Sequence, residues 1–346
     1  MTTRSMRLAA STIIAGCLCL GAGAALAQTA ATTGTPASQT AAQVFNHARI
    51  VLGNLGQTYY SYETDGGLPN VSYNATSGKY DVDTDCSGWI SYLLGGSATA
   101  NYNGFYAFLQ NYMGTFKRNN PGYGSGDNYP QAFVYAAGFK LLQTQPTAIP
   151  GFAAVTDLRT IQPGDIIAWC GTTFCNGVAS KGDTGHVMLA IGPAQQVAVN
   201  CSTVTAANKN MCDSIVPTAL GSNKASLPGA VWAVEVADES CLSHYSTSNA
   251  WGNKLNTVGW PSNRTFNTPV CQAVAGGNPR NLGGGVGTGF IFFTVNGSGV
   301  PLQHQFAAGD PFFPPYVAGS DVATFTTQAV GQTTIGRLVD VTSTVN

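Results

Sequence analysis

Asp85-Cys86-Ser87-Gly88-Trp89 is the stretch that decides the fold, because a polar segment changes there into an apolar one. Residues 73–84 before it are mostly polar. Residues 89–94 after it are mostly apolar and end at Gly95-Gly96. This pattern predicts a loop that leads into a short helix with glycine at its end. Cys86 is then expected in the first turn of that helix.

The expected position of Cys86 favours a reactive thiolate. Backbone N–H groups without helical partners, together with the positive end of the helix dipole, stabilise negative charge at a helix start. A thiolate there is a nucleophile, and the surrounding N–H groups can hold an oxyanion. The alternative is a buried or disulfide-bonded cysteine without chemistry. The stretch alone leaves both interpretations open.

The composition limits the class of protein. The chain has 346 residues, with 42 glycines and only 9% charged residues. These values favour an extracytoplasmic, loop-rich, β-containing fold over a helical bundle or a disordered chain. The formal net charge is −1, and no cluster of Lys and Arg occurs after the first seven residues. A nucleic-acid partner is therefore not expected.

Residues 1–27 have the pattern of a secretory signal peptide. Arg4 and Arg7 precede an apolar stretch, residues 8–26, and Ala25-Leu26-Ala27 is a small-residue cleavage site. The mature chain would begin at Gln28 and be secreted or periplasmic. A lipoprotein processed at Cys17 is the alternative, although the apolar stretch continues past that residue. No later segment is long and apolar enough to be inserted stably in a membrane.

The cysteines suggest which thiol is reactive. Nine cysteines, without Cys17 and Cys19 of the signal peptide, leave seven in the mature chain. An odd number in an oxidising compartment leaves one thiol outside the intramolecular disulfides. Cys86 is distant in sequence from the other six, and neighbours among these could pair. Neighbours in sequence would pair as Cys170 with Cys175, Cys201 with Cys212, and Cys241 with Cys271, although the sequence does not fix this connectivity. Zinc is the alternative for Cys170 and Cys175, and export favours disulfides.

Periodicity predicts the order of the elements. Residues 28–39 form a flexible, Ala/Thr/Pro-rich lead-in, and residues 40–55 have the apolar spacing of a helix. Strands are expected later in the chain, at residues 166–169, 185–192, 231–238 and 290–295, with one or two more in 322–342. The expectation is an α+β fold in which N-terminal helices pack on an antiparallel sheet or half-barrel.

A cysteine at a helix start, a histidine at a strand start and a polar residue at a later strand end are the parts of a nucleophilic site. The thiol and the imidazole need hydrogen-bond reach, and the third group fixes the imidazole tautomer. Cys86 and His186, which begins the strand after Gly185, have the expected local contexts. His244 follows Asp238 closely and could bind substrate, although an exposed loop histidine is the preferred interpretation, and His304 is expected in a Gln-rich loop without a role.

These residues resemble a family, the NlpC-like branch of papain-fold cysteine peptidases and amidases. The resemblance is carried by Asp85-Cys86-Ser87-Gly88-Trp89, Pro163-Gly164-Asp165-Ile166-Ile167 and Gly185-His186-Val187-Met188. An upstream segment, Gly56-Gln57-Thr58-Tyr59 with Gly66-Gly67, is similar to the family pattern but has Thr58 where proline is usual. The resemblance covers about residues 40–240. It implies an exported enzyme that cleaves amide bonds in peptidoglycan stem peptides.

The resemblance also implies roles for single residues. Cys86 would be the nucleophile and His186 the general base. Tyr59 would line the pocket near the oxyanion, although it is equally interpretable as a packed aromatic residue. Asp85 and Ser87 would shape the loop or touch substrate, or alternatively cap the helix.

The third catalytic residue is where the sequence departs from the family pattern. The family places it on the strand just after the histidine, about a dozen residues on. Asn200 fits if residues 197–200 form that strand. Asp238 fits, and is preferred, if residues 195–229 are an insertion and the strand is residues 231–238. Glu235 is a third candidate, although strand alternation places it and Asp238 on opposite faces.

The resulting domain prediction is a single papain-like catalytic domain, residues 40–346. It would carry insertions at 97–160 and 195–229 and a C-terminal extension from about 271 to 346. No cofactor and no metal are expected, and the oligomeric state is open. Two other functions are considered, a papain-fold acyltransferase or amidase acting on another substrate, and an inert wall-binding module stapled by disulfides.

Overall fold

The computed structural model describes residues 34–61, 70–123, 129–171, 174–179, 184–198, 230–240, 244, 280–281, 285–305 and 333–341. The predicted signal peptide and the first half of the lead-in, residues 28–33, lie outside these residues. So do the candidate Asn200 and four of the cysteines assigned to disulfides, Cys201, Cys212, Cys241 and Cys271.

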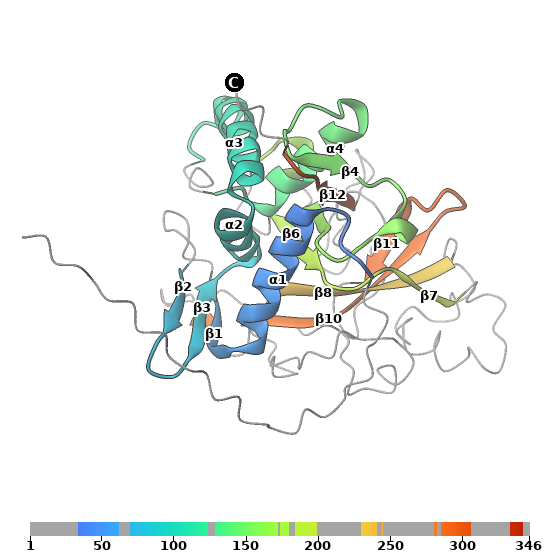
Figure 1. Cartoon of the computed structure of the whole chain (residues 1–346). Coiled ribbons are helices and arrows are strands. Elements are labelled where there is room, and N and C mark those ends of the chain that lie inside the picture. The colour runs from blue at the N-terminus through green and yellow to red at the C-terminus, as the bar shows by residue number, and fades with distance from the viewer. Residues whose placement is uncertain are drawn as a thin grey trace, which may run out of the picture. The chain divides into compact units, whose positions relative to one another are not determined.

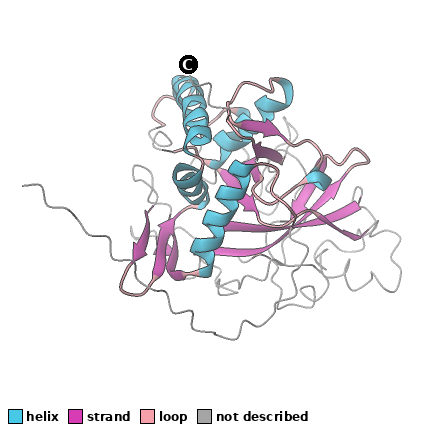
Figure 2. Cartoon of the chain, viewed as in Figure 1, coloured by secondary structure: helices cyan, strands magenta, loops and turns pink. Residues whose placement is uncertain are grey.

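The described residues form a mixed α+β structure with two sheets (Figures 1 and 2). The helices are α1 (Gln39–Gly53), α2 (Cys86–Ser97), α3 (Thr99–Asn119) and α4 (Ala132–Thr144), with 3₁₀ turns at Leu158–Thr160 and Phe174–Asn176. The expected α+β class, with helices from the N-terminal part of the chain and an antiparallel sheet, is therefore confirmed at this level.

The large sheet carries most of the later residues. Its order is β11 (Pro301–Gln305), β10 (Gly285–Val295), β8 (Ala230–Ser240), β6 (Gly185–Ala190), β5 (Ile166–Cys170), β12 (Thr334–Leu338) and β4 (Phe152–Ala154), with β7 (Gln195–Ala198) also paired to β8. Its neighbouring strands are antiparallel. The strands predicted near residues 166, 185, 231 and 290 are all present.

The small sheet has the order β2 (Asn70–Asn74), β3 (Lys79–Thr84), β1 (Leu55–Ser61) and β9 (Arg280–Asn281). β2 and β3 form a hairpin where the sequence predicted a loop, so that prediction was wrong. Val71 pairs with Val82 and Tyr73 with Tyr80 across the hairpin, and Gly78 has φ of 68° in the turn. The short alternation of valine and tyrosine is masked in the sequence by the polar residues of the exposed face.

The predicted helix at 40–55 is α1. Its apolar side chains recur at helical spacing and are buried, and Ser38 Oγ accepts a hydrogen bond from the Ala41 N–H at 3.0 Å. That contact supplies the N-cap that a serine at this position provides. The core-facing stripe therefore follows directly from the sequence.

The end of α2 differs from the prediction. The helix continues through Gly95 and Gly96 to Ser97. Ser97 Oγ lies 2.7 Å from His47 Nδ1 of α1, and Tyr92 Oη lies 3.3 Å from His47 Nε2. These contacts hold the last turn of α2 against α1, so packing overrides the low helix propensity of glycine.

Residues 97–160, expected as an insertion, supply part of the main core. They form the end of α2, all of α3 and α4, and β4, and their buried aromatic residues belong to the same apolar cluster as α2. Phe105 packs at ring-centroid distances of 4.7 Å from Tyr135 and 5.3 Å from Phe152. The segment is therefore part of the core that packs against α2, the helix that carries Cys86.

A buried ion pair joins β12 to the turn before β5. Asp165 is fully buried and accepts hydrogen bonds from Arg337 Nε at 2.9 Å and Nη2 at 2.8 Å. The Gln162 N–H donates to the same carboxylate at 2.9 Å. Burial raises the pKa of Asp165, and the neighbouring Arg337 opposes that rise.

Replacement of Arg337 by Leu is expected to lower the free energy of unfolding at pH 7 by about 3 kcal/mol, because the Asp165 charge stays buried without its cation. In this variant the folded-state pKa of Asp165 exceeds the unfolded value. The loss relative to wild type therefore grows as pH rises above the folded-state pKa of Asp165 in wild type, which burial already raises, and shrinks below it. Urea denaturation at pH 7 and pH 4 measures both effects. Arg159→Leu, which breaks the exposed pair with Asp157, is the matched control and should cost less than about 1 kcal/mol. Equal losses for the two variants would contradict this account.

Candidate active site

The first turn of α2 holds Cys86 at its expected place. Asp85 is the N-cap, and its Oδ1 accepts hydrogen bonds from the Gly88 N–H at 2.7 Å and from Ser87 Oγ at 2.9 Å. A Cβ on Gly88 would lie 1.9 Å from Thr84 Oγ1, so only glycine fits against the preceding strand. Asp85 thus has the capping role that the sequence left as one of two options, and Ser87 donates to the capping carboxylate. Cys86 is buried.

Replacement of Asp85 by Ala is expected to lower the free energy of unfolding by about 1 kcal/mol, since the Gly88 N–H loses its acceptor. Asp85→Asn keeps an oxygen acceptor and serves as the control, with a change of only a few tenths of that value. Chemical denaturation of the two variants against wild type measures the difference. A loss of equal size in both would show that the cap oxygen is not the source of the effect.

His186 enters the site from the start of β6. Gly185, just before it, has φ of 109°, and a Cβ there would lie 2.0 Å from the Trp169 carbonyl oxygen. Glycine therefore allows β6 to begin close against β5, and His186 then pairs with Trp169 across the two strands. The His186 and Trp169 rings lie 5.5 Å apart. The histidine is thus held by the sheet, with only 6% of its surface exposed.

Asp238 is the residue that reaches His186. The His186 Nε2–Asp238 Oδ2 distance is 2.5 Å, and Asp238 is fully buried near the end of β8. With Asp238 ionised, the carboxylate can only accept, so in that state the imidazole donates from Nε2 and the lone pair is on Nδ1. This is the tautomer that a general base needs if it is to accept a proton at Nδ1.

The other two candidates for the third catalytic residue are Glu235 and Asn200. Glu235 is buried on the same strand, three residues from Asp238, and therefore points to the other face of the sheet. Asn200 lies outside the described residues. Among the described residues, the contact with His186 favours Asp238, the candidate that the sequence preferred.

His244 is a member of the site that the sequence missed. It was expected in an exposed loop, but it is 2% exposed, and its Nε2 lies 2.8 Å from the same Asp238 Oδ2. The two imidazole rings have centroids 6.4 Å apart at an interplanar angle of 76°. A second donor helps to compensate the charge of a carboxylate that is wholly removed from water. The only signal in the sequence was its closeness to Asp238.

His304 also differs from its expectation. It lies on β11 rather than in a loop, is buried, and stacks on Trp169 with a centroid distance of 4.0 Å. Burial, followed by the influence of His186, lowers the pKa of His304 to about 3. His304 is therefore neutral at ordinary pH, and it supports the ring of Trp169, which in turn lies beside His186.

Strand pairing brings the start of α2 to the end of the large sheet that holds His186 and Asp238. β10 pairs with the end of β8 that carries Asp238. In that part of β10, the Val286 N–H donates to Thr58 Oγ1 of β1 at 2.7 Å. β1 pairs with β3, and β3 ends at Thr84, two residues before Cys86. α2 itself packs against β6 and β8.

Burial shows which face of the large sheet α2 covers. Cys86 belongs to the same apolar cluster as Val187 and Ala237. Val187 follows His186 in sequence, and Ala237 precedes Asp238. The α2 helix therefore packs on the face of β6 and β8 that carries Val187 and Ala237. The His186 and Asp238 side chains alternate with these residues and lie with Met188 and Val236 on the other face, at the end of the sheet where α2 begins.

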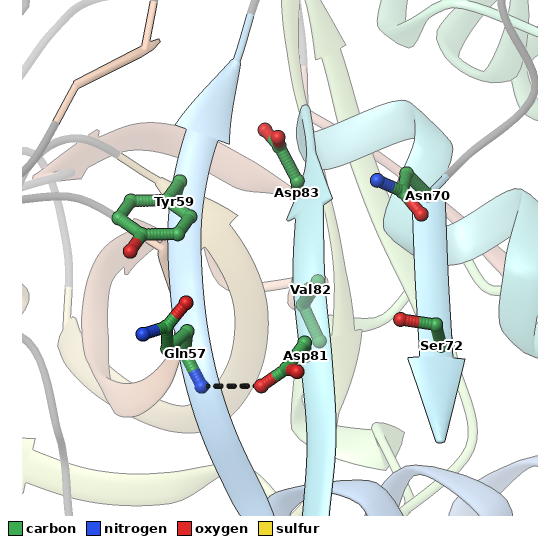
Figure 3. A pocket seen from close by; sticks show the side chains of 7 residues that line it. All are labelled: Gln57, Tyr59, Asn70, Ser72, Asp81, Val82 and Asp83. Carbon is green, nitrogen blue, oxygen red and sulfur yellow. Dashed lines mark hydrogen bonds between the residues drawn. The ribbon is translucent and has the colours of Figure 1, made fainter. Parts of the chain in front are cut away.

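A polar pocket lies on one face of the small sheet, over β1, β3 and β2 (Figure 3). Its volume is about 160 Å³, and its lining residues are Gln57, Tyr59, Asn70, Ser72, Asp81, Val82 and Asp83. The Gln57 N–H donates to Asp81 Oδ1 at 2.8 Å. Asp83 is three residues before Cys86, so their Cα atoms are at most about 11 Å apart. Tyr59 thus lines a pocket near the cysteine.

The described cysteines agree with part of the cysteine prediction. Cys170 and Cys175 form a disulfide, as expected, and Cys86 is the described cysteine that keeps its thiol. The proposed pairs Cys201–Cys212 and Cys241–Cys271 lie outside the described residues. The expectation that the one reactive thiol is Cys86 remains a prediction.

Within the described part of the chain, no helix has the length and apolarity required to cross a membrane. A scan against protein-family models, a search of curated proteins and a search of solved structures each find no match to the chain.

Proposed function

We propose that the protein is a secreted cysteine hydrolase that cleaves amide bonds, with peptidoglycan stem peptides as its substrate class. In this proposal the domain is papain-like and related to the NlpC-like enzymes that its motifs resemble. The observation that carries the proposal is the His186–Asp238 contact at 2.5 Å, at the end of the sheet where α2 begins with Cys86. A signal-like N-terminus supports an extracytoplasmic substrate.

The first half of the reaction begins at Cys86. His186 Nδ1 accepts the thiol proton, while Asp238 accepts the hydrogen bond from Nε2–H and stabilises the imidazolium that forms. The thiolate attacks the carbonyl carbon of the scissile amide. The negative charge passes to the carbonyl oxygen, where the Cys86 N–H and the Tyr59 hydroxyl are the proposed donors. The imidazolium then gives its proton to the leaving amine, and a thioester remains.

The second half of the reaction regenerates the thiol. A water molecule gives a proton to His186 Nδ1 and attacks the thioester carbon. Collapse of the intermediate releases the carboxylic acid, and the proton returns to the Cys86 sulfur. His186 Nδ1 is the proton acceptor in both halves of the reaction, and the hydrogen bond to Asp238 keeps His186 in the tautomer that this requires.

The polar pocket of Figure 3 supports a polar substrate. Two carboxylates, Asp81 and Asp83, share its wall with the amide groups of Gln57 and Asn70. Such a surface offers hydrogen bonds to a peptide with polar and amino groups and little apolar contact. Stem peptides have that character.

Digestion of purified peptidoglycan tests the proposal. The mature chain is expected to release stem-peptide fragments that mass spectrometry identifies by a newly formed amine and carboxylate, and Cys86→Ala is expected to release none. If the wild-type chain leaves peptidoglycan intact but transfers acyl groups to added amines, the acyltransferase alternative is supported instead. If the variant releases the same fragments as wild type, the proposed mechanism is wrong.

A further inference from the structure

His186, Asp238 and His244 form a cluster larger than the proposed reaction requires. Hydrolysis uses one imidazole and one carboxylate, yet two imidazole Nε2 atoms lie at 2.5 Å and 2.8 Å from the same Asp238 oxygen. These three atoms all lie within 4.8 Å of one another, and all three residues are buried. A second imidazole nitrogen converging on this point is a feature that needs its own explanation.

The donor set has a clear metal preference. Two imidazole nitrogens and one carboxylate oxygen suit zinc and similar divalent transition metals. Magnesium and calcium prefer sites made mostly of oxygen ligands. We propose that His186, Asp238 and His244 bind a divalent transition metal ion of the zinc class, and that the bound ion inhibits the hydrolase.

Binding requires a rearrangement of the three ligand atoms, which now lie within 4.8 Å of one another, by up to about 1.5 Å. Tetrahedral zinc with bonds of about 2.0–2.1 Å places neighbouring ligand atoms about 3.3 Å apart. The two nitrogen–oxygen distances are shorter than that, because hydrogen bonds now join these atoms. Each must lengthen by less than about 1 Å.

Inhibition follows from the tautomer of His186. In the hydrogen-bonded state Nε2 carries the proton and Nδ1 carries the lone pair. A metal ion takes the lone pair of Nε2, so the proton of the neutral ring moves to Nδ1. Nδ1 then has no lone pair to accept the Cys86 proton. The ring exchanges its Nε2–H bond for an Nδ1–H bond and gains the metal–nitrogen bond, and no oxidation state changes. This second half of the inference rests on the proposed function, whereas metal binding does not.

Binding is tested by titrating zinc into the chelator-treated mature chain in a calorimeter. Three proteins are compared, namely wild type, Cys86→Ala and His244→Gln. The glutamine keeps an amide donor near Asp238 but is a poor zinc ligand, so it separates metal binding from the hydrogen bond. Wild type and Cys86→Ala are expected to bind one ion with Kd values within about threefold of each other. His244→Gln is expected to bind at least about tenfold more weakly.

Three results would overturn the metal site. These are no binding by wild type at micromolar zinc, equal binding by His244→Gln, and loss of binding in Cys86→Ala, which would place the ion on the thiol. Circular dichroism checks that each variant folds. If His244→Gln does not fold, the cobalt(II) spectrum of wild type replaces it. Tetrahedral bands without a thiolate charge-transfer band support the site, and a thiolate band contradicts it.

The inhibition half has its own measurement. Zinc is added during peptidoglycan digestion, and each protein is compared with its own zinc-free rate. Half-inhibition of His244→Gln should need at least about tenfold more zinc than that of wild type, and a chelator should restore both rates. Equal sensitivity of wild type and His244→Gln to zinc would overturn the proposed inhibition. If zinc binds as expected but wild type digests nothing, the metal site stands and the proposed function fails.

Discussion

Replacement of Cys86 by Ala is expected to lower kcat for amide hydrolysis by at least about 10⁴-fold, because the step that forms the covalent intermediate loses its nucleophile. The site is already built on a stable helix start, with the cap from Asp85, so the smaller side chain should leave the fold in place. Release of peptide fragments over time, with purified peptidoglycan in excess, measures the change.

Cys86→Ser is the matched control for this variant. The hydroxyl has nearly the same shape but is a far weaker nucleophile, so its rate should fall almost as much as that of the alanine variant. Thermal unfolding of both variants checks that the loss is chemical. Retention of more than about a tenth of the wild-type rate by Cys86→Ala would exclude the thiolate mechanism.

Replacement of Asp238 by Asn is expected to lower kcat by about 10³–10⁴-fold with a much smaller change in KM. An asparagine amide turned toward His186 can donate to Nε2, which moves the ring proton to Nδ1 and leaves the base in the wrong tautomer. The removed interaction matters most when the imidazolium forms, so the effect falls on kcat. Steady-state kinetics on an isolated stem peptide separates the two constants.

Glu235→Gln is the control for the Asp238 variant, since both change a buried carboxylate of β8 to an amide. Glu235 lies on the other face of the strand, and its variant should keep kcat within about tenfold of wild type. The reverse result, a large loss for Glu235→Gln and a small one for Asp238→Asn, would assign the third role to Glu235.

The parts of the site that the sequence predicted are those fixed by local patterns. Asp85, Cys86 and Gly88 lie within four residues, so the helix start and its cap could be read directly. The strand start at His186 is equally local, because it depends on Gly185 and the apolar residues that follow. In both cases short-range sterics and hydrogen bonds decide the structure.

The remaining parts depend on contacts between distant residues. Asp238 is 52 residues from His186, and only the sheet register brings their side chains together, which is why Asn200 and Glu235 stayed open as alternatives. His244 lacks an apolar or alternating context and resembled a loop residue. The β2–β3 hairpin was missed because its exposed face is polar. The α2 helix continues through Gly95 and Gly96, where the sequence predicted its end, because contacts with His47 hold its last turn.

The central claim is that His186 activates Cys86, and the rate of alkylation by iodoacetamide at pH 6 tests it most directly. An ordinary cysteine thiol is almost fully protonated at this pH and reacts slowly, as the urea-unfolded chain should. Mass spectrometry locates the modified residue. Cys86 of the folded wild type is expected to react at least about tenfold faster than in the unfolded chain, and His186→Ala is expected to lose that advantage. Equal rates for wild type and His186→Ala would contradict the account.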